Sequence, residues 1–338
     1  MTHDSRHNPS LEEHPFAQYV RILGKGKTGT RSLEQDEARS AFGMILRGEV
    51  EDLQLGAFLM LLRVKEETGS ELAGFVQACR DAMRQPGSLN ADLDWSSYAG
   101  KKHQHPWFLL SALLLAENGY RIFIHGSDGH TPGRLYTGEA MASLGLPPAT
   151  DWGEVGAQLD SSGISYLSLA HFCPALHHIM QLKPILGLRS PVNTLARMFN
   201  PLACEASIQS IFHPAYGELH RATDELLGQV RSLVFKGDSG EVEIKPHAET
   251  RLMHWVDGKG FEQNLPRRIS GRVASVEQPN TAAVASVWRG EGSDEYGEFA
   301  VIDTATAALL VLQPELTIDS ARQLAAEFWE RRNRDRLG

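Results

Sequence analysis

The stretch GEVEDLQLGAFLMLLRVKEETGSELAGF, residues 48–75, decides the fold of the N-terminal part of the chain. Hydrophobic residues recur in it at helical spacing, at Leu55, Phe58, Leu59 and Leu62. This spacing predicts a helix with one buried face. Thr68, followed three residues later by Glu71, predicts a capping box at the start of a second helix. The stretch is therefore expected to hold two packed helices.

The same kind of pattern continues on both sides of this stretch. A capping box of Ser32 and Gln35 is predicted ahead of an earlier amphipathic helix, and a proline and a glycine end the helical pattern near residue 86. We therefore predict a small N-terminal helical domain over residues 14–86, preceded by a disordered leader over residues 1–13. The rest of the chain, residues 87–338, is predicted to form a second domain.

Strand and helix patterns alternate in this second domain. Apolar strands are predicted near residues 120–126, 164–170, 207–213 and 231–237, with helical segments between them. Such alternation predicts βαβ units and a mostly parallel sheet flanked by helices. The expected fold class is therefore α/β, with a small helical domain at the N-terminus. Apolar helices are also predicted from about residue 280 onward, where they would cover the sheet.

Composition limits the classes of protein to consider. A chain of 338 residues with 42% hydrophobic content can bury a large core and favours two domains. The sequence has no apolar run of about 18 residues and begins with a polar segment, so we expect a cytoplasmic protein without a membrane partner. Three cysteines without metal-ligand spacing fit a reducing compartment. The net charge of −9 argues against a surface that is basic all over, but it leaves room for a local basic groove.

The helical motif resembles the N-terminal domain of anthranilate phosphoribosyltransferase and its relatives. The matching positions are Gly48, Glu49, Val50, Gln54, Ala57, Phe58, Leu59, Met60, Leu62, Arg63, Lys65, Glu71, Ala73, Gly74 and Phe75. The resemblance implies a phosphoribosyltransferase fold in which residues 177–204 return to complete the helical domain. It also implies a homodimer formed through that domain.

The segment that resembles the family's pyrophosphate-binding loop differs here. The family loop reads like G-T-G-G-D-G followed by N-x-S-T, whereas residues 98–107 read YAGKKHQHPW. A single glycine is left, and bulky Pro106 and Trp107 replace the hydroxyl residues, so the backbone has lost the flexibility to wrap a diphosphate. Side-chain cations stand there instead, and they suit phosphates spread along a polymer. The alternative is that a degenerate loop drifted to solvated residues.

The segment that resembles the family's magnesium site also differs. Relatives carry two adjacent acids, because carboxylate oxygens hold Mg²⁺ against the diphosphate. Residues 236–243 read KGDSGEVE here, which places Val242 and Glu243 at the acidic pair. Valine cannot bind a metal ion, so we predict no metal site and no cofactor. Mg²⁺ would be needed only if the chain is an active transferase.

The acceptor pocket of the family is kept in part. The resemblance implies a residual pocket at His125, Ser127, His178, Arg189 and Asn193. Arg189 is the position that meets the acceptor's carboxylate in relatives. Where the family motif has Gly-Pro, this chain has Ala196 and Arg197, and the arginine adds a cation to the expected cleft between the domains.

Together these changes resemble a diverged branch of the family, the YbiB type, which is associated with nucleic-acid binding by a homodimer. We therefore predict a catalytically silent homologue that binds DNA or RNA through a basic groove, with little sequence preference. The predicted phosphate-binding residues are Lys25, Lys27, Arg31, Lys101, Lys102, His103, Arg134, Arg189 and Arg197. One alternative is an active transferase that uses phosphoribosyl pyrophosphate with anthranilate or another aromatic acceptor. Another is a protein-interaction scaffold.

Overall fold

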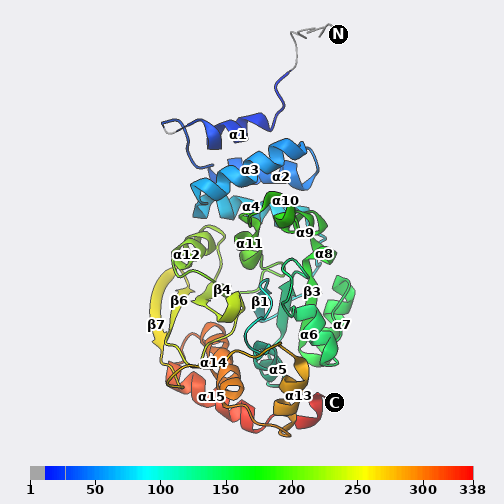
Figure 1. The fold of residues 1–338 in the computed structure, drawn as a ribbon, viewed down its shortest axis with the longest axis vertical. Helices are drawn as coiled ribbons and strands as arrows, with labels where there is room; N and C mark the ends of the chain where they lie inside the picture. The colour runs from blue at the N-terminus through cyan, green and yellow to red at the C-terminus, as the bar shows by residue number, and fades with distance from the viewer. Residues whose placement is uncertain (1–11, 27, 338) are drawn as a thin grey trace.

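Four helices form a helical unit at one end of the molecule (Figure 1). The structure, a computed structural model, describes residues 12–26 and 28–337. The helices of the unit are α1 (Ala17–Gly24), α2 (Gln35–Leu46), α3 (Asp52–Lys65) and α4 (Gly69–Ala82). Most of the predicted leader, residues 1–11, lies outside the described residues. The domain boundaries named above stay predictions.

Local capping determines where these helices begin. The Thr68 hydroxyl accepts a hydrogen bond from the Glu71 amide at 3.3 Å, and the Glu71 carboxylate accepts one from the Thr68 amide at 2.8 Å. The predicted capping box of α4 is therefore confirmed. The box predicted at Ser32 is wrong, because α2 is capped two residues later by Glu34 and Glu37. Acidic side chains at these helix starts also complement the helix dipole.

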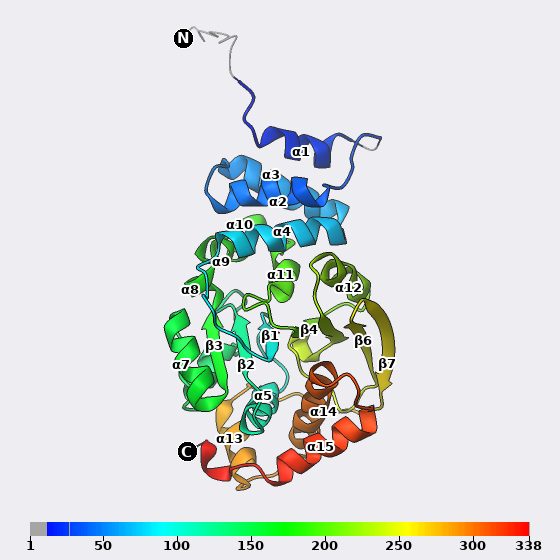
Figure 2. The same cartoon turned by 180° about the vertical axis from the view of Figure 1, so that it is seen from behind.

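A second group of helices lies between the helical unit and the sheet (Figure 2). These short helices are α8 (Leu169–Phe172), α9 (Pro174–Met180), α10 (Lys183–Leu186) and α11 (Val192–Leu195). Their apolar side chains share one buried cluster with those of α2, α3 and α4. The chain thus returns to the helical unit after its first three strands.

A mostly parallel sheet forms the centre of the larger part, and this confirms the predicted fold class. In the described residues its strand order is β3-β2-β1-β4-β5-β6-β7. The first five strands run parallel, and β6 and β7 form an antiparallel hairpin at one edge. Their bounds are β1 (Leu93–Ser97), β2 (Ile122–Gly126), β3 (Ile164–Ser168), β4 (Ala206–Ile211), β5 (Arg231–Lys236), β6 (Thr250–Val256) and β7 (Lys259–Leu265).

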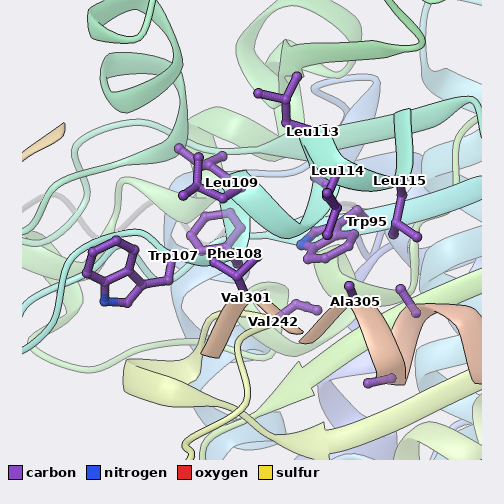
Figure 3. Close-up of a cluster of buried hydrophobic side chains, with 14 of the residues drawn as sticks. Trp95, Trp107, Phe108, Leu109, Leu113, Leu114, Leu115, Val242, Val301 and Ala305 are labelled. Atoms are coloured by element: carbon purple, nitrogen blue, oxygen red, sulfur yellow. The ribbon is translucent and has the colours of Figure 1, made fainter. Parts of the chain in front are cut away.

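Helices cover both faces of this sheet, so most strands are buried on both sides. The flanking helices are α5 (Phe108–Glu117), α6 (Thr137–Ser143), α7 (Trp152–Ser162), α12 (Tyr216–Leu226), α13 (Thr281–Arg289), α14 (Glu295–Leu312) and α15 (Ile318–Glu330). Figure 3 shows Trp95 of β1 packed among side chains of α5 and α14, with Val242 beneath Phe108. No helix in residues 12–26 or 28–337 has the length and apolar character needed to cross a membrane.

Candidate functional site

The loop after β1 is closed by a carboxylate of its own chain. Glu241, which is buried, accepts hydrogen bonds from the backbone amides of Ala99 and Gly100 and from the Ser97 hydroxyl at 2.7 Å. Backbone amides that converge in this way form an anion site. Here the anion is supplied by Glu241 itself. The two amides are therefore not free to receive a phosphate group in this arrangement.

A buried lysine neutralises the two other acids of the same region. The ammonium group of Lys101 contacts the carboxylates of Asp238 and Glu243, and its side chain is only 1% exposed. Glu243 also accepts a hydrogen bond from the Phe108 amide at 2.9 Å, at the start of α5. Lys101 pairs with Leu135 in an isolated β-bridge. The backbone of Lys101 is thus held against Leu135, and its side chain lies in the interior with its two acids.

The protonation of this ion cluster follows from its burial and its charges. Burial raises the pKa of Glu243 to about 7. Burial alone would lower the pKa of the Lys101 ammonium group. The Glu243 and Asp238 carboxylates outweigh this effect, so the pKa is raised. The same ammonium group lowers the pKa of Asp238 against the effect of burial. The cluster is therefore close to neutral when Glu243 holds a proton.

The residues of this region do not fit a magnesium ion. Mg²⁺ demands near-octahedral coordination by oxygen atoms. Asp238 and Glu243 already hold an ammonium group between them, and Val242 is buried in the apolar core. A divalent cation would have to displace the ammonium group of Lys101 from both carboxylates.

A cavity of about 430 Å³ lies between the helical unit and the end of β4. Four cationic side chains line it, and they come from α3, from α10 and from the segment after α10: Arg63, Lys183, Arg189 and Arg197. Glu67 is the acid among the described residues of the lining, and burial raises the pKa of its carboxyl group. The cavity is therefore electropositive and suited to an anionic ligand.

Three of the sequence-predicted residues meet at this cavity. Arg197 is half-buried and donates hydrogen bonds to the carbonyls of Ser210 at 3.0 Å and Gly240 at 2.7 Å. Arg189 is exposed at the rim, with Thr131 Oγ1 at 3.3 Å from its guanidinium, and Asn193 lines the wall. These three residues therefore line one cavity, in agreement with the prediction that they lie in one cleft.

Three other predicted pocket residues are not brought to this cavity. His125 is fully buried on β2, where its Nδ1 lies 2.7 Å from the Tyr98 hydroxyl and its Nε2 lies 3.1 Å from Asp94 Oδ1. Ser127 is also buried, and His178 is exposed on α9 outside the lining. Their assignment to an acceptor pocket is thus corrected. His125 instead links β2 to the neighbouring strand β1.

The predicted cations near the N-terminus lie away from the cavity lining. Lys25 is exposed in the loop after α1, and Lys27 lies outside the described residues. The Arg31 guanidinium is exposed but binds both carboxylate oxygens of Glu37, at 2.6 and 2.7 Å. Such an exposed pair stabilises the fold only weakly. Of these two cations, Arg31 is thus paired with an acid, whereas no ion pair of Lys25 is found among residues 12–26 and 28–337.

The cations of the loop after β1 divide into buried and exposed ones. Lys101 is buried and contacts two acids, so its prediction as a phosphate-binding cation is wrong. Lys102 and His103 are exposed but do not line the cavity. Arg134 is half-buried and donates to the carbonyls of Ala99 and Gly100, both at 2.9 Å. It therefore holds the loop in place, and its guanidinium is engaged with backbone.

Two family models match the chain. The helical bundle domain of the glycosyl transferase family matches residues 18–83, and the a/b domain of that family matches residues 108–331. The chain belongs to the anthranilate phosphoribosyltransferase-like family. Its relatives in this glycosyl transferase family include the Escherichia coli protein YbiB, which is 30% identical over 252 residues, or 73% of this chain and 78% of YbiB.

Enzymes of the family are similar over most of their length. Anthranilate phosphoribosyltransferase of Methylocella silvestris is 28% identical over 314 residues, 90% of this chain and 89% of the enzyme. The Thermus thermophilus enzyme superposes with a TM-score of 0.73 at 23% identity, over 92% of this chain and 94% of that one. The Saccharomyces cerevisiae enzyme in complex with PRPP and Mg gives 0.75 at 14% identity, over 94% of both chains. These two superpositions support the fold alone.

Several cavity residues of this family member were missed in the sequence. Arg63 was recognised as part of the family motif but not as a residue of the cleft, and Lys183 was not considered. Phe212, His213 and Tyr216 follow β4, and a signal for them was present, because residues after parallel strands gather at one edge of a sheet. Their aromatic character was not used in the prediction.

Proposed function

We propose that this family member has no transferase activity and binds nucleic acid through its phosphates, with little sequence preference. The arrangement of the loop after β1 carries the proposal. Glu241 occupies the amides of that loop, and Lys101 occupies the space between Asp238 and Glu243. A donor diphosphate and its metal ion would need both sets of groups.

Cations that line two cavities beside residues 211–214 support phosphate binding. Arg63, Lys183 and Arg189 line the cavity described above. A second cavity, of about 340 Å³, is lined by Lys236 and Lys245. Ile211 lines both cavities, so both border residues 211–214. A phosphate backbone that runs along this segment would meet the cations of both cavities.

The first test is the salt dependence of oligonucleotide binding. With about four phosphates neutralised, the affinity for a labelled single strand should fall roughly fiftyfold between 50 and 200 mM salt, because bound counterions are released. Fluorescence anisotropy measures this. The double variant Arg63→Ala, Lys183→Ala should weaken binding and reduce the slope of the logarithmic plot by roughly 1.4. Neither change should depend on the sequence of the oligonucleotide.

Arg331→Ala is the matched control for this test. Arg331 is exposed and follows α15, which lies at the opposite end of the molecule from the helical unit (Figure 1). Its removal should leave affinity and slope unchanged. No binding at low salt, or binding that is insensitive to salt, would contradict the proposal.

An active transferase is the second candidate. Arg189 and Asn193 line the cavity, and the Saccharomyces cerevisiae enzyme of similar fold binds PRPP and Mg. Calorimetric titration with phosphoribosyl pyrophosphate and Mg²⁺, followed by a turnover assay with anthranilate, separates the two candidates. We expect neither saturable heat nor product. Turnover would establish the transferase instead.

We also propose a homodimer formed through the helical unit. Leu53 is 89% exposed and Val64 is 83% exposed, both on α3. A second copy of the unit would remove these side chains from water. Leu53→Asp is expected to shift the species seen in sedimentation velocity from dimer to monomer. Leu226→Asp, which alters an exposed leucine of α12, should leave the dimer intact; a wild-type monomer at micromolar concentration would exclude the arrangement.

A further inference from the structure

Phe212 presents an uncovered aromatic side chain at the cationic cavity. The residue follows β4 directly, lines the cavity and is 54% exposed. Its ring contacts His213 edge to face, with 4.9 Å between the ring centres. Leaving a large aromatic side chain in water forgoes about 1.5–3 kcal/mol of hydrophobic free energy. An exposed ring at the edge of a cationic cavity is therefore suited to contact a flat ligand.

The ring of Phe212 lies close to the guanidinium of Arg197. A Cβ atom placed on Gly240 would be 3.7 Å from Phe212 Cδ2 and 3.7 Å from Arg197 Nη2. Both groups therefore border the same point beside Gly240. Arg197 is in turn fixed by the carbonyls of Ser210 and Gly240. The structure thus combines an aromatic surface and a positioned cation at one place.

His220 adds a hydrogen-bond acceptor to the cavity. The Gln209 amide nitrogen donates to both carboxylate oxygens of Asp224, at 3.1 and 3.2 Å, so the Gln209 amide oxygen accepts a hydrogen bond from His220 Nδ1–H at 2.7 Å. This assigns Nε2 of His220 as an acceptor. The ring lines the cavity and is nearly fully buried, and burial lowers its pKa to about 3, so it stays neutral. Adenine, cytosine, guanine and the pyrimidine imides all carry an N–H donor, so this acceptor imposes little sequence preference.

We propose that one unpaired nucleobase stacks on Phe212 at the mouth of the cavity, so that the site prefers single-stranded over duplex nucleic acid. The inference rests on the proposed nucleic-acid binding and names its substrate class. Stacking of a base on an aromatic ring tolerates any sequence, because every base has a π face. In a duplex the base is already paired and stacked, and its extrusion costs free energy. The cations of the two cavities that border residues 211–214 would hold the neighbouring phosphates.

The test compares three labelled ligands with the full-length wild type and its variants at one salt concentration. The ligands are a single-stranded DNA, its duplex, and an abasic strand of equal length with the same number of phosphates. We expect the wild type to bind the single strand at least about tenfold more tightly than the other two. Phe212→Ala should lose about tenfold for the single strand and nothing for the duplex. Phe212→Trp should retain the preference.

Leu226→Ala is the matched control, because Leu226 is an exposed apolar side chain, 43% accessible, that does not line the cavity. A strand that carries 2-aminopurine gives a second readout, since stacking on Phe212 should quench its fluorescence in the wild type and not in Phe212→Ala. If the abasic strand binds as tightly as the normal one, or if Phe212→Ala weakens duplex and single strand equally, base stacking is excluded while phosphate binding stands. Failure of all three ligands to bind at low salt would instead exclude the proposed function, and the stacking with it.

Discussion

Replacing Lys101 with methionine is expected to lower the free energy of unfolding by about 3–5 kcal/mol at pH 8, because it leaves two buried carboxylates without a counter-charge. Methionine keeps much of the length of the side chain, so the loss is mainly electrostatic. Asp238 and Glu243 are both buried and both contact the ammonium group. Urea denaturation followed by circular dichroism measures the change.

Lys102→Met is the control for this prediction. Lys102 is the exposed neighbour of Lys101, and its replacement should change the free energy of unfolding by no more than about 0.5 kcal/mol. Adding Asp238→Asn and Glu243→Gln to Lys101→Met should recover much of the lost stability, because no buried charge is then left unpaired. Equal stability of the Lys101 and Lys102 variants would show that the ion cluster contributes nothing.

The penalty of Lys101→Met should also depend on pH. Burial already raises the pKa of Glu243 to about 7, and loss of the ammonium group removes the charge that opposes this rise. In the variant, the folded state then binds protons more strongly than the unfolded state does. Its stability therefore increases as the pH falls toward the ordinary range of a carboxyl group. We expect a smaller penalty at pH 5.5 than at pH 8.

These internal contacts satisfy the buried polar groups of the loop after β1 without a bound ligand. Glu241 supplies an internal anion to the amides of Ala99 and Gly100, and Lys101 supplies an internal cation to two acids. These buried amides and acids are thus satisfied within the chain. The cationic cavity beside them is left for ligands that need only side-chain charge.

The elements that could be predicted are those whose signal is local. The helix around Phe58, the cap at Thr68 and the strands β2, β3, β4 and β5 follow from periodicity, turn residues and apolar runs. Strand β1 was missed because buried polar residues, Asp94, Ser96 and Ser97, interrupt its apolar pattern. The hairpin of β6 and β7 was missed although Asp257 and Gly258, both with positive φ, are a hairpin-turn signal.

The candidate site was harder to predict because its contacts are distant in sequence. Lys101 was interpreted as a phosphate-binding cation, because the acids that allow a lysine to be buried cannot be recognised in its local sequence. Its partners Asp238 and Glu243 lie 137 and 142 residues further along the chain. Arg189 and Arg197 could be placed in a cleft through the family motif alone. The role proposed for Phe212 could not be predicted, because only the fold places this residue beside these cations.

Replacing His220 with glutamine is expected to reduce the acid sensitivity of the protein. Burial, followed by the nearby charge of Arg197, lowers the pKa of His220 to about 3. In the unfolded chain the imidazole has its ordinary pKa of about 6.5, so between these values only the unfolded state binds the proton. Stability is then lost as the pH falls through this window. Between pH 6.5 and 4.5 the loss from this one residue is about 2.3 kcal/mol.

The measurement is the free energy of unfolding in urea at several pH values, for the wild type and His220→Gln. Other buried groups titrate in the same range, among them Asp224, whose pKa is raised by burial to about 6, so the absolute pH profile is not diagnostic. The difference between the two proteins isolates His220, and it should shrink by about 2.3 kcal/mol between pH 6.5 and 4.5, because only the wild type must keep a buried imidazole neutral. His178→Gln, which alters an exposed histidine, should follow the wild-type profile. Parallel profiles for wild type and His220→Gln would mean that the imidazole takes up its proton equally in the folded and unfolded states, and would contradict the lowered pKa that keeps the buried ring neutral in acid.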